Sequence, residues 1–347
     1  MRTHLDRRGI IRDTACVVKS CEQIRSISLV IVNESHDEIM QPLTADTLGG
    51  TWSTLLLPIN EDDSIDLERL SGQIDRLIQF KVDGIYTNGT AGEFDNQTEV
   101  EFEQISQRLS EACHAAQVPF QIGVSHSSPI LSRDRLRRVV ALRPSAIQLI
   151  LPDWSQISLR EAIRFLRTMA EEAEGIGLVL YNPPHAKRCL LPGEFARIKQ
   201  AVPNLIGLKV LGGDAAWFEE MTRLAPDLSI FVAGHLLAEK HPFGARGSYS
   251  NVACINPRAA RDWQRTMKTD ASAALELGAR IQGFMQDHIV LFLEQGYSNQ
   301  AVDKLLACIG AWADLTPRLR WPYDWISGDE VERLRPLAQE QLPEFFL

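Results

Sequence analysis

Lys209 is the residue of this sequence whose surroundings most strongly indicate chemistry. It lies in the run "NLIGLKVLGGD", residues 204–214, whose apolar members indicate a buried strand. Burial disfavours the charged form of an amine, so the pKa of Lys209 should be lowered, and a neutral amine can form a Schiff base with a carbonyl compound. The alternative is an ammonium that pairs with a carboxylate or extends to solvent. The neighbouring apolar runs, 177–182 and 229–234, contain no carboxylate, which favours the chemical interpretation.

Tyr181 ends the preceding apolar run, "LVLYNPP" at residues 178–184. Because consecutive strands are usually neighbours, its phenol should lie beside the amine of Lys209. A phenol in that place can carry the proton that carbinolamine formation and dehydration require. A core tyrosine whose hydroxyl only reaches the rim is the alternative, and the sequence leaves both open.

The segment "NGTAGEF", residues 88–94, is a candidate anion-binding loop. Gly89 and Gly92 allow a tight turn that exposes backbone N–H groups to a carboxylate or a phosphate, and Thr90 adds a hydroxyl. Glu93 could brace the loop. An ordinary turn between a strand and a helix has the same composition, so this motif alone does not distinguish an anion-binding loop from such a turn.

Short β-rich runs alternate with amphipathic helical segments from Gly49 onward, and this alternation must position the three motifs. The predicted strands are 51–57, 84–88, 119–125, 146–151, 177–182, 205–210, 229–234 and 247–251. The predicted helices are 65–80, 98–116, 132–142, 158–174, 193–201, 214–224 and 236–243. The pattern predicts an α/β fold, a (β/α)8 TIM barrel, in which chemistry takes place at the carboxyl ends of the strands. An open doubly wound sheet is the alternative, but no G-x-G-x-x-G follows the first strand.

Side-chain alternation within the sixth strand places Leu205, Gly207 and Lys209 on one face, with Lys209 directed into the barrel. The predicted organisation has three parts: an N-terminal extension over 1–48, the barrel over 49–256, and C-terminal helices packed on the barrel over 257–347. The extension could instead lie upstream of a true start at Met40, or form an arm that packs on a partner subunit.

Composition excludes several classes of protein. The chain has 347 residues and a net charge of −9, which argues against a nucleic acid as the main partner. No apolar run is long enough to suggest a membrane span. The six cysteines form no C-x-x-C pair, which is typical of reduced thiols in a cytoplasmic protein. The eight histidines show no metal-binding spacing, so no metal site is expected.

The motifs "GTAGE", "YNPP" and "GLK", in this order and spacing, resemble the dihydrodipicolinate synthase/N-acetylneuraminate lyase family. "LLPINEDDSID" (56–66) and "GARGSYSN" (244–251) are similar to that family's first-strand motif and last-strand glycine turn. The resemblance spans roughly Gly49 to Pro257. It implies a class I mechanism without a cofactor, in which a 2-oxo acid, usually pyruvate, forms a Schiff base. It also implies a homotetramer, a dimer of dimers.

The resemblance assigns roles to individual residues. Lys209 would be the Schiff-base lysine, Tyr181 the proton shuttle and Thr90 the relay hydroxyl. The backbone of the loop would hold the substrate carboxylate, and Tyr249, by its place before Ser250, would lie near the bound keto acid. The residues implied to bind substrate in these two places are Gly89, Ala91, Tyr249 and Ser250.

Three positions depart from the family pattern. Ala91 replaces a second hydroxyl residue, and Asp153 and Trp154 stand where the synthases have a tyrosine pair. Ala186 replaces an arginine, although His185 is close and could contact the distal part of the substrate, as could Lys187. Trp154 could bind substrate as a lid over its own site or contact a neighbouring subunit.

These departures favour a lyase that cleaves, condenses or dehydrates another pyruvate-like 2-oxo acid. The alternatives are a 4-hydroxy-tetrahydrodipicolinate synthase proper, and a non-catalytic barrel that binds 2-oxo acids.

Overall fold

Eight parallel strands close into a barrel in the computed structural model, which describes residues 40–347. Most of the predicted extension over 1–48 therefore lies outside the described residues. The strands are β1 Gly50–Thr54, β2 Gly84–Thr87, β3 Phe120–Gly123, β4 Ala146–Ile150, β5 Gly177–Asn182, β6 Leu205–Val210, β7 Ser229–Ala233 and β8 Ala245–Tyr249. Pairing of β1 with β8 closes the barrel, which confirms the predicted TIM barrel and excludes the open sheet.

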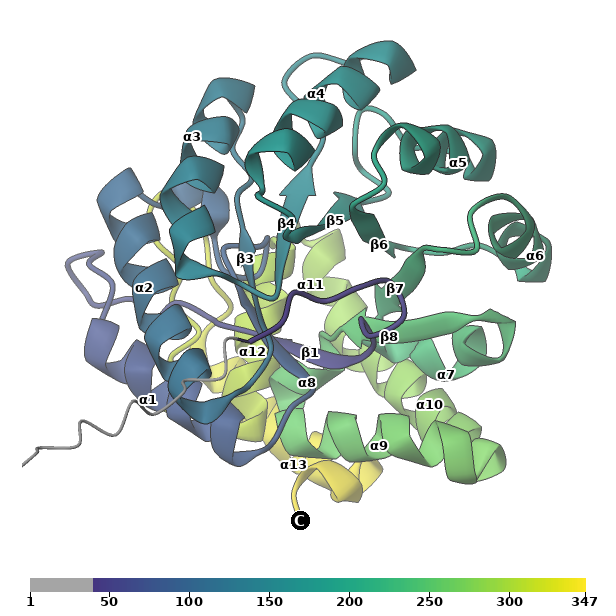
Figure 1. Ribbon diagram of the computed structural model, residues 1–347. Helices are drawn as coiled ribbons and strands as arrows, with labels where there is room; N and C mark the ends of the chain where they lie inside the picture. The colour runs from purple at the N-terminus through teal and green to yellow at the C-terminus, as the bar shows by residue number, and fades with distance from the viewer. Residues whose placement is uncertain (1–39) are drawn as a thin grey trace, which may run out of the picture. The chain divides into compact units, whose positions relative to one another are not determined.

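Helices follow the strands and cover the outside of the barrel (Figure 1). They are α1 Leu67–Gln79, α2 Glu99–Ala116, α3 Pro129–Val139, α4 Leu159–Glu172, α5 Pro192–Ala201, α6 Ala215–Leu224, α7 Leu237–Lys240 and α8 Val252–Ile255. Local sequence sets where they begin: Thr98 forms a capping box with Glu101 at the start of α2. The helix predicted over 236–243 is a single turn with 3₁₀ turns on either side, because Pro242 has no N–H to continue it.

Aromatic side chains fill the interior of the barrel. Trp52, Tyr86, Phe231 and Tyr249 are each at most 4% exposed. The ring centroid of Tyr249 lies 4.9 Å from those of both Tyr86 and Phe231. These rings lie in the barrel interior, beneath the residues at the carboxyl ends of the strands.

Leu48 closes this interior cluster where the strands begin. Its side chain is fully buried, and its carbonyl accepts a hydrogen bond of 2.7 Å from Oγ of Ser229, the first residue of β7. Further back, the backbone N–H of Leu43 donates to the carbonyl of Ser145 at 2.8 Å. Leu43 and Leu48, which precede Gly49, therefore pack with the barrel.

Strand β6 has a bulge at Ile206. Val179 of β5 pairs with Gly207, while the residue before Val179 pairs with Leu205, so Ile206 is skipped in the register. Ile206 belongs to the interior cluster, whereas Leu205 packs in the core between the strands and the helices. The prediction that Leu205 shares a face with Lys209 is therefore wrong, because the bulge inverts the alternation below Gly207.

The C-terminal part is helical, as predicted, and contains five α-helices. They are α9 Pro257–Thr269, α10 Ala271–Phe284, α11 Val290–Glu294, α12 Asn299–Gly310 and α13 Gly328–Gln341. Helices α9 and α10 pack beside α7, whereas α11 and α12 lie across one end of the barrel (Figure 1). Helix α12 packs against α8, the turn that follows β8, so the tail reaches the carboxyl ends of the strands.

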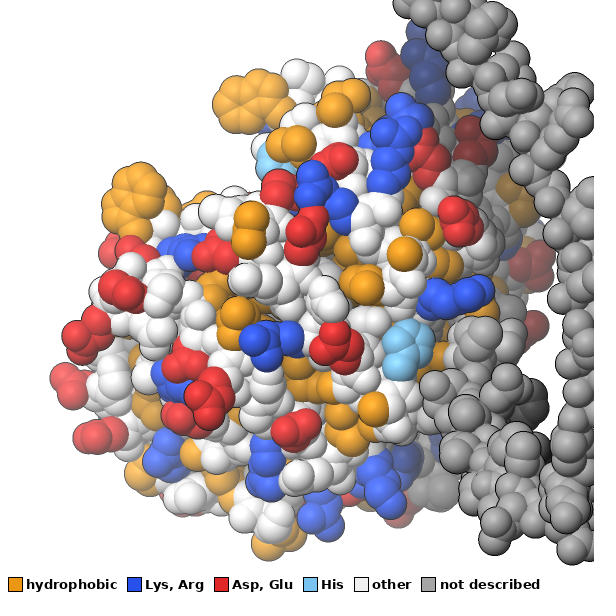
Figure 2. Space-filling model, turned by 60° about the vertical axis from the view of Figure 1, so that its left-hand side comes forward, with side chains coloured by type: hydrophobic (Ala, Val, Ile, Leu, Met, Phe, Trp, Pro, Cys, Tyr) orange, Lys and Arg blue, Asp and Glu red, His pale blue; other side chains and the backbone are white. Residues whose placement is uncertain are grey.

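The surface carries charges of both signs without a single dominant patch on the face drawn in Figure 2. That face lies on the side where Figure 1 has α1, α2 and α3. Within residues 40–347, none of the helices has both the length and the apolar character needed to cross a membrane.

The end of α12 depends on a glycine, which gives a first prediction. A Cβ at Gly310 would lie 1.6 Å from the carbonyl oxygen of Ile255, so Gly310→Ala must push α12 away from α8. We expect it to lower the free energy of unfolding by about 1–3 kcal/mol, measured by denaturant titration. Gly283→Ala in α10, where a Cβ meets nothing within 4 Å, is the matched control and should be neutral or stabilising. Equal stability of the two variants would contradict the close packing of α12.

Candidate active site

The amine of Lys209 lies among tyrosine rings near the carboxyl end of β6. Its Nζ is 4.2 Å from the ring centroid of Tyr181, 5.3 Å from that of Tyr249 and 5.4 Å from that of Tyr86. Tyr181 is also its partner in the register between β5 and β6. Burial lowers the pKa of Lys209 to about 8, against the opposing effect of the negative charge on Asp303. Roughly a tenth of the amine is therefore neutral at pH 7, far more than in an ordinary lysine.

The phenol of Tyr181 connects this amine to the loop after β2. Its hydroxyl is hydrogen-bonded to the side chain of Thr90. Burial raises the pKa of Tyr181 to about 12, so the phenol keeps its proton and can donate it. The fold thus brings together Lys209, Tyr181 and Thr90, which come from three separate segments.

The loop over 88–94 presents free backbone donors beside this pair. The N–H groups of Gly92 and Glu93 donate back to Gly89 and Thr90, each at 3.0 Å. Within the described residues, the N–H groups of Thr90 and Ala91 have no such acceptor. Two adjacent free donors next to a hydroxyl are suited to a carboxylate.

A buried ion pair fixes the far end of this loop. Nζ of Lys304 in α12 lies 2.7 Å from a carboxylate oxygen of Glu93, and the two side chains are 0% and 3% exposed. The ammonium also donates to the carbonyl of Arg318 at 2.6 Å. Glu93 adopts a left-handed backbone conformation with φ of 51°, which the ion pair helps to hold. The tail therefore anchors the loop that carries Thr90.

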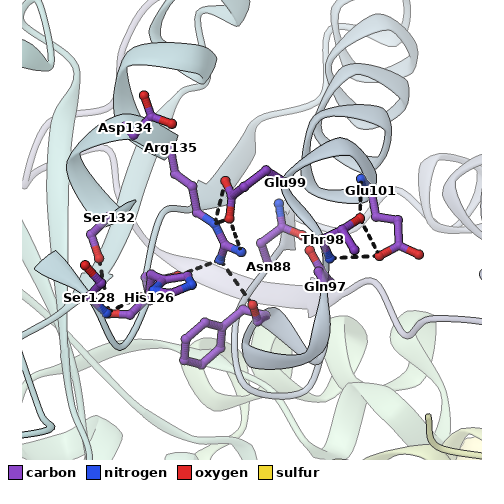
Figure 3. Close-up of polar contacts among 12 residues, drawn as sticks. Asn88, Gln97, Thr98, Glu99, Glu101, His126, Ser128, Ser132, Asp134 and Arg135 are labelled. Atoms are coloured by element: carbon purple, nitrogen blue, oxygen red, sulfur yellow. Dashed lines mark hydrogen bonds and ion pairs between the residues drawn. The ribbon is translucent and has the colours of Figure 1, made fainter. Parts of the chain in front are cut away.

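Arg135 of α3 braces the same loop from the other side (Figure 3). Its guanidinium is fully buried and donates to the carboxylate of Glu99 at 2.9 Å. It also donates to the carbonyls of Ser125 at 2.7 Å and Phe94 at 3.1 Å. These bonds join the loops that follow β2 and β3, so both are held at the carboxyl end of the barrel.

A cavity of about 460 Å³ opens at this end of the barrel, a size typical of small-molecule sites. Thr90, Tyr181 and His185 line one side of it. The start of the tail helix lines the other side, through residues 297–300. The cavity is therefore enclosed jointly by the barrel and the tail.

The predicted substrate-binding residues fall into different places. Gly89 and Ala91 lie in the loop, Tyr249 lies beside Lys209, and His185 lines the cavity. Oγ of Ser250 accepts a hydrogen bond of 2.9 Å from the backbone N–H of Ala253, so it caps the turn of α8.

Trp154 follows Asp153, which lines the cavity, but does not itself line it. Its side chain is 82% exposed, and Nζ of Lys187 lies 5.3 Å from its ring centroid. The same Nζ donates to the carbonyl of Trp154, at 2.5 Å. Whether this ring binds substrate stays a prediction.

Sequence reasoning missed Tyr86 and Lys304. Tyr86 faces the interior by the same alternation that was applied to Lys209, so counting along β2 would have found it. Asp303 and Lys304 interrupt an otherwise apolar stretch of helix, "AVDKLLACI", and adjacent charges there were the available signal.

A barrel with these features defines a class, the enzymes of the dihydrodipicolinate synthetase family. That family's model matches residues 47–341, and the chain belongs to it. The resemblance drawn from the motifs is therefore confirmed.

Individual relatives are more distant. N-acetylneuraminate lyase of Rhizobium meliloti (strain 1021) is 28% identical over 187 residues, which are 53% of this chain and 60% of that lyase. 4-hydroxy-tetrahydrodipicolinate synthase of Ectopseudomonas mendocina is 27% identical over 298 residues, 84% of this chain and 98% of the relative. The solved sialic acid aldolase of Ruminococcus gnavus has a TM-score of 0.75 at 17% identity, covering 86% of this chain and 99% of the aldolase, and shows the shared fold. Family and relatives together support a lyase of the class I aldolase type.

The buried ion pair gives the second prediction. Lys304→Met leaves the carboxylate of Glu93 buried without a counter-charge, so we expect a loss of about 3–5 kcal/mol in the free energy of unfolding. The double variant Glu93→Gln, Lys304→Met should recover part of that loss because no buried charge remains. The exposed pair of Arg333 and Glu330 is the control, and its disruption should cost at most about 1 kcal/mol. A neutral Lys304→Met would contradict the anchoring role.

Proposed function

We propose that the protein is a lyase that forms a Schiff base between Lys209 and a pyruvate-like 2-oxo acid. The supporting observation is an amine of lowered pKa, enclosed by tyrosine rings and next to the hydrogen-bonded pair of Tyr181 and Thr90. The free N–H groups of Thr90 and Ala91 would bind the substrate carboxylate.

The chemistry follows from these positions. Neutral Nζ of Lys209 attacks the C2 carbonyl carbon, and the phenol of Tyr181 supplies the proton that turns the developing alkoxide into a hydroxyl. The nitrogen of the adduct then returns one proton to the phenolate of Tyr181. When the phenol protonates the hydroxyl, water leaves and the nitrogen lone pair forms the iminium. Thr90 passes protons between Tyr181 and the substrate. The iminium then accepts the electron pair of the bond broken at C3–C4, or of the C3–H bond before condensation or dehydration.

Substrate choice beyond the 2-oxo acid would depend on the mouth of the cavity. His185 lines it, whereas Lys187 is engaged with Asp153 through its backbone N–H and with Trp154 through its side chain. We therefore propose His185 rather than Lys187 as the contact for the distal part of the substrate.

Assembly and location remain proposals. We propose a homotetramer, built as a dimer of dimers, in which the exposed ring of Trp154 meets a neighbouring subunit. We also propose a cytoplasmic location, on the spacing of the cysteines.

The third prediction is covalent trapping. Pyruvate with cyanoborohydride should add one reduced adduct per chain, on the peptide that contains Lys209, as measured by intact mass and peptide mapping. The rate of trapping should rise with pH through about 8, because only the neutral amine attacks. Lys209→Arg should abolish labelling, since a guanidinium stays protonated, whereas Lys268→Arg in α9 should leave it unchanged.

The outcomes of trapping separate the alternatives. An adduct elsewhere, or none with any 2-oxo acid tested, would overturn the Schiff-base mechanism. Efficient consumption of pyruvate with aspartate semialdehyde would identify a synthase proper. An adduct at Lys209 without turnover of any aldol or hydroxy acid would support the alternative of a barrel that binds 2-oxo acids without catalysis.

The fourth prediction concerns assembly. If Trp154 anchors an interface, Trp154→Ala should weaken association about tenfold or more and shift the protein toward smaller species in sedimentation velocity. Trp321→Ala is the matched control, because that ring is 75% exposed and lies in the tail. An unchanged assembly with weaker substrate binding would instead make Trp154 a lid, and a monomeric wild type would end the tetramer proposal.

A further inference from the structure

A primary amide lies inside the barrel beneath the loop over 88–94. It belongs to Gln148 of β4, whose side chain is 2% exposed. Ala146 of the same strand belongs to the interior cluster, and side-chain alternation places Gln148 on the same face. The intervening Ile147 and the following Leu149 pack toward the helices instead. A polar side chain here is unusual, because branched apolar residues dominate the interior of a TIM barrel.

Contacts with the loop fix where this amide lies. In the register, Gln148 pairs with Gly123 of β3, and a Cβ on Gly123 would lie 2.1 Å from the carbonyl oxygen of Asn88. The start of the loop therefore packs directly against β3, next to β4. A Cβ on Gly89 would lie 3.3 Å from Oε1 of Gln148. The amide thus reaches the interior side of Gly89, which directly precedes the two free N–H groups of the loop.

The amide has hydrogen-bonding capacity that the protein does not use. Among the residues that the structure describes, none accepts a hydrogen bond from Nε2 of Gln148. The phenol of Tyr249 interacts with this amide, but its oxygen could accept only one of the two N–H groups that an amide nitrogen carries. A buried donor without an acceptor is unfavourable, and a ligand that supplies the acceptor removes that cost.

The amide and the amine of Lys209 adjoin the same aromatic ring. The point that a Cβ of Gly89 would occupy is 3.3 Å from Oε1 of Gln148 and 3.0 Å from Cε2 of Tyr86. The ring centroid of Tyr86 is in turn 5.4 Å from Nζ of Lys209. A 2-oxo acid attached to Nζ carries its carboxylate on the adjacent carbon, so the carboxylate can reach the space between the loop and this ring.

We propose that the amide of Gln148 donates a hydrogen bond to the carboxylate of the 2-oxo acid, beside the N–H groups of Thr90 and Ala91. This rests on the proposed Schiff-base function. Ala91 has no hydroxyl, so the interior of the barrel supplies a side-chain donor that the loop lacks. Gln148 then selects 2-oxo acids over uncharged ketones, because a hydrogen bond to a carboxylate is about twice as strong as one to a neutral acceptor.

Covalent trapping measures this selectivity. The efficiency of trapping with cyanoborohydride at low ketone concentration is compared for pyruvate and for pyruvamide, its uncharged amide. Gln148→Met keeps the approximate size of the side chain and removes the donor. We expect the ratio of the two efficiencies at Lys209 to fall about tenfold, because the variant loses more with pyruvate than with pyruvamide.

A stability measurement separates substrate binding from a structural role. Removal of a buried donor that has no acceptor should leave the free energy of unfolding unchanged or raise it, as measured by denaturant titration. Gln148→Leu repeats the test with a second apolar side chain, in case the methionine packs badly. Gln107→Met on α2 is the matched control, because its exposed amide donates to Glu111 far from the barrel interior, and it should leave the ratio unchanged.

The outcomes separate this inference from the function on which it rests. If the wild type is trapped at Lys209 and both Gln148 variants keep its ratio, the inference fails and the function stands. If no 2-oxo acid is trapped by the wild type, the function fails and the inference fails with it. Reduced stability with an unmoved ratio would show that the amide is structural, and an equal loss with both ketones would show that it only positions the lysine. Either result would overturn the proposal.

Discussion

The contact between Lys304 and Glu93 is the interaction on which the site depends. An ammonium and a carboxylate that are both out of water are stable only with each other, so the pair fixes the distance between α12 and the loop after β2. That loop carries the free N–H groups and the hydroxyl of Thr90. The barrel provides the lysine and the tyrosine, but the geometry of the loop is completed by the tail.

Helix α12 contributes to two parts of the site. Lys304 holds the loop, and the first turn of the helix lines the cavity through Asn299 and Gln300. The close contact of Gly310 with Ile255 sets how near this helix lies to α8. A small displacement of α12 would therefore change the position of the loop and the lining of the cavity at once.

The sequence allowed the barrel, its strand order and the group of Lys209, Tyr181 and Thr90 to be predicted, because alternating strands and helices have only one common closed arrangement. The bulge at Ile206 was beyond prediction, since it arises from pairing with β5 rather than from local residue types. The ion pair of Lys304 with Glu93 was missed because the contacts of a tail helix with the barrel are long-range, and no periodicity within the helix indicates them.

The dependence of the loop on α12 has a consequence for synthesis of the chain. All eight strands have left the ribosome before residue 304 is made, so the nascent barrel carries Glu93 without its partner. Domains fold as their segments emerge from the ribosome. The loop after β2 therefore reaches its final conformation only once α12 has been synthesised, although all the strands of the barrel are present earlier. The order of translation thus delays the assembly of the reactive site until the last quarter of the chain is being added.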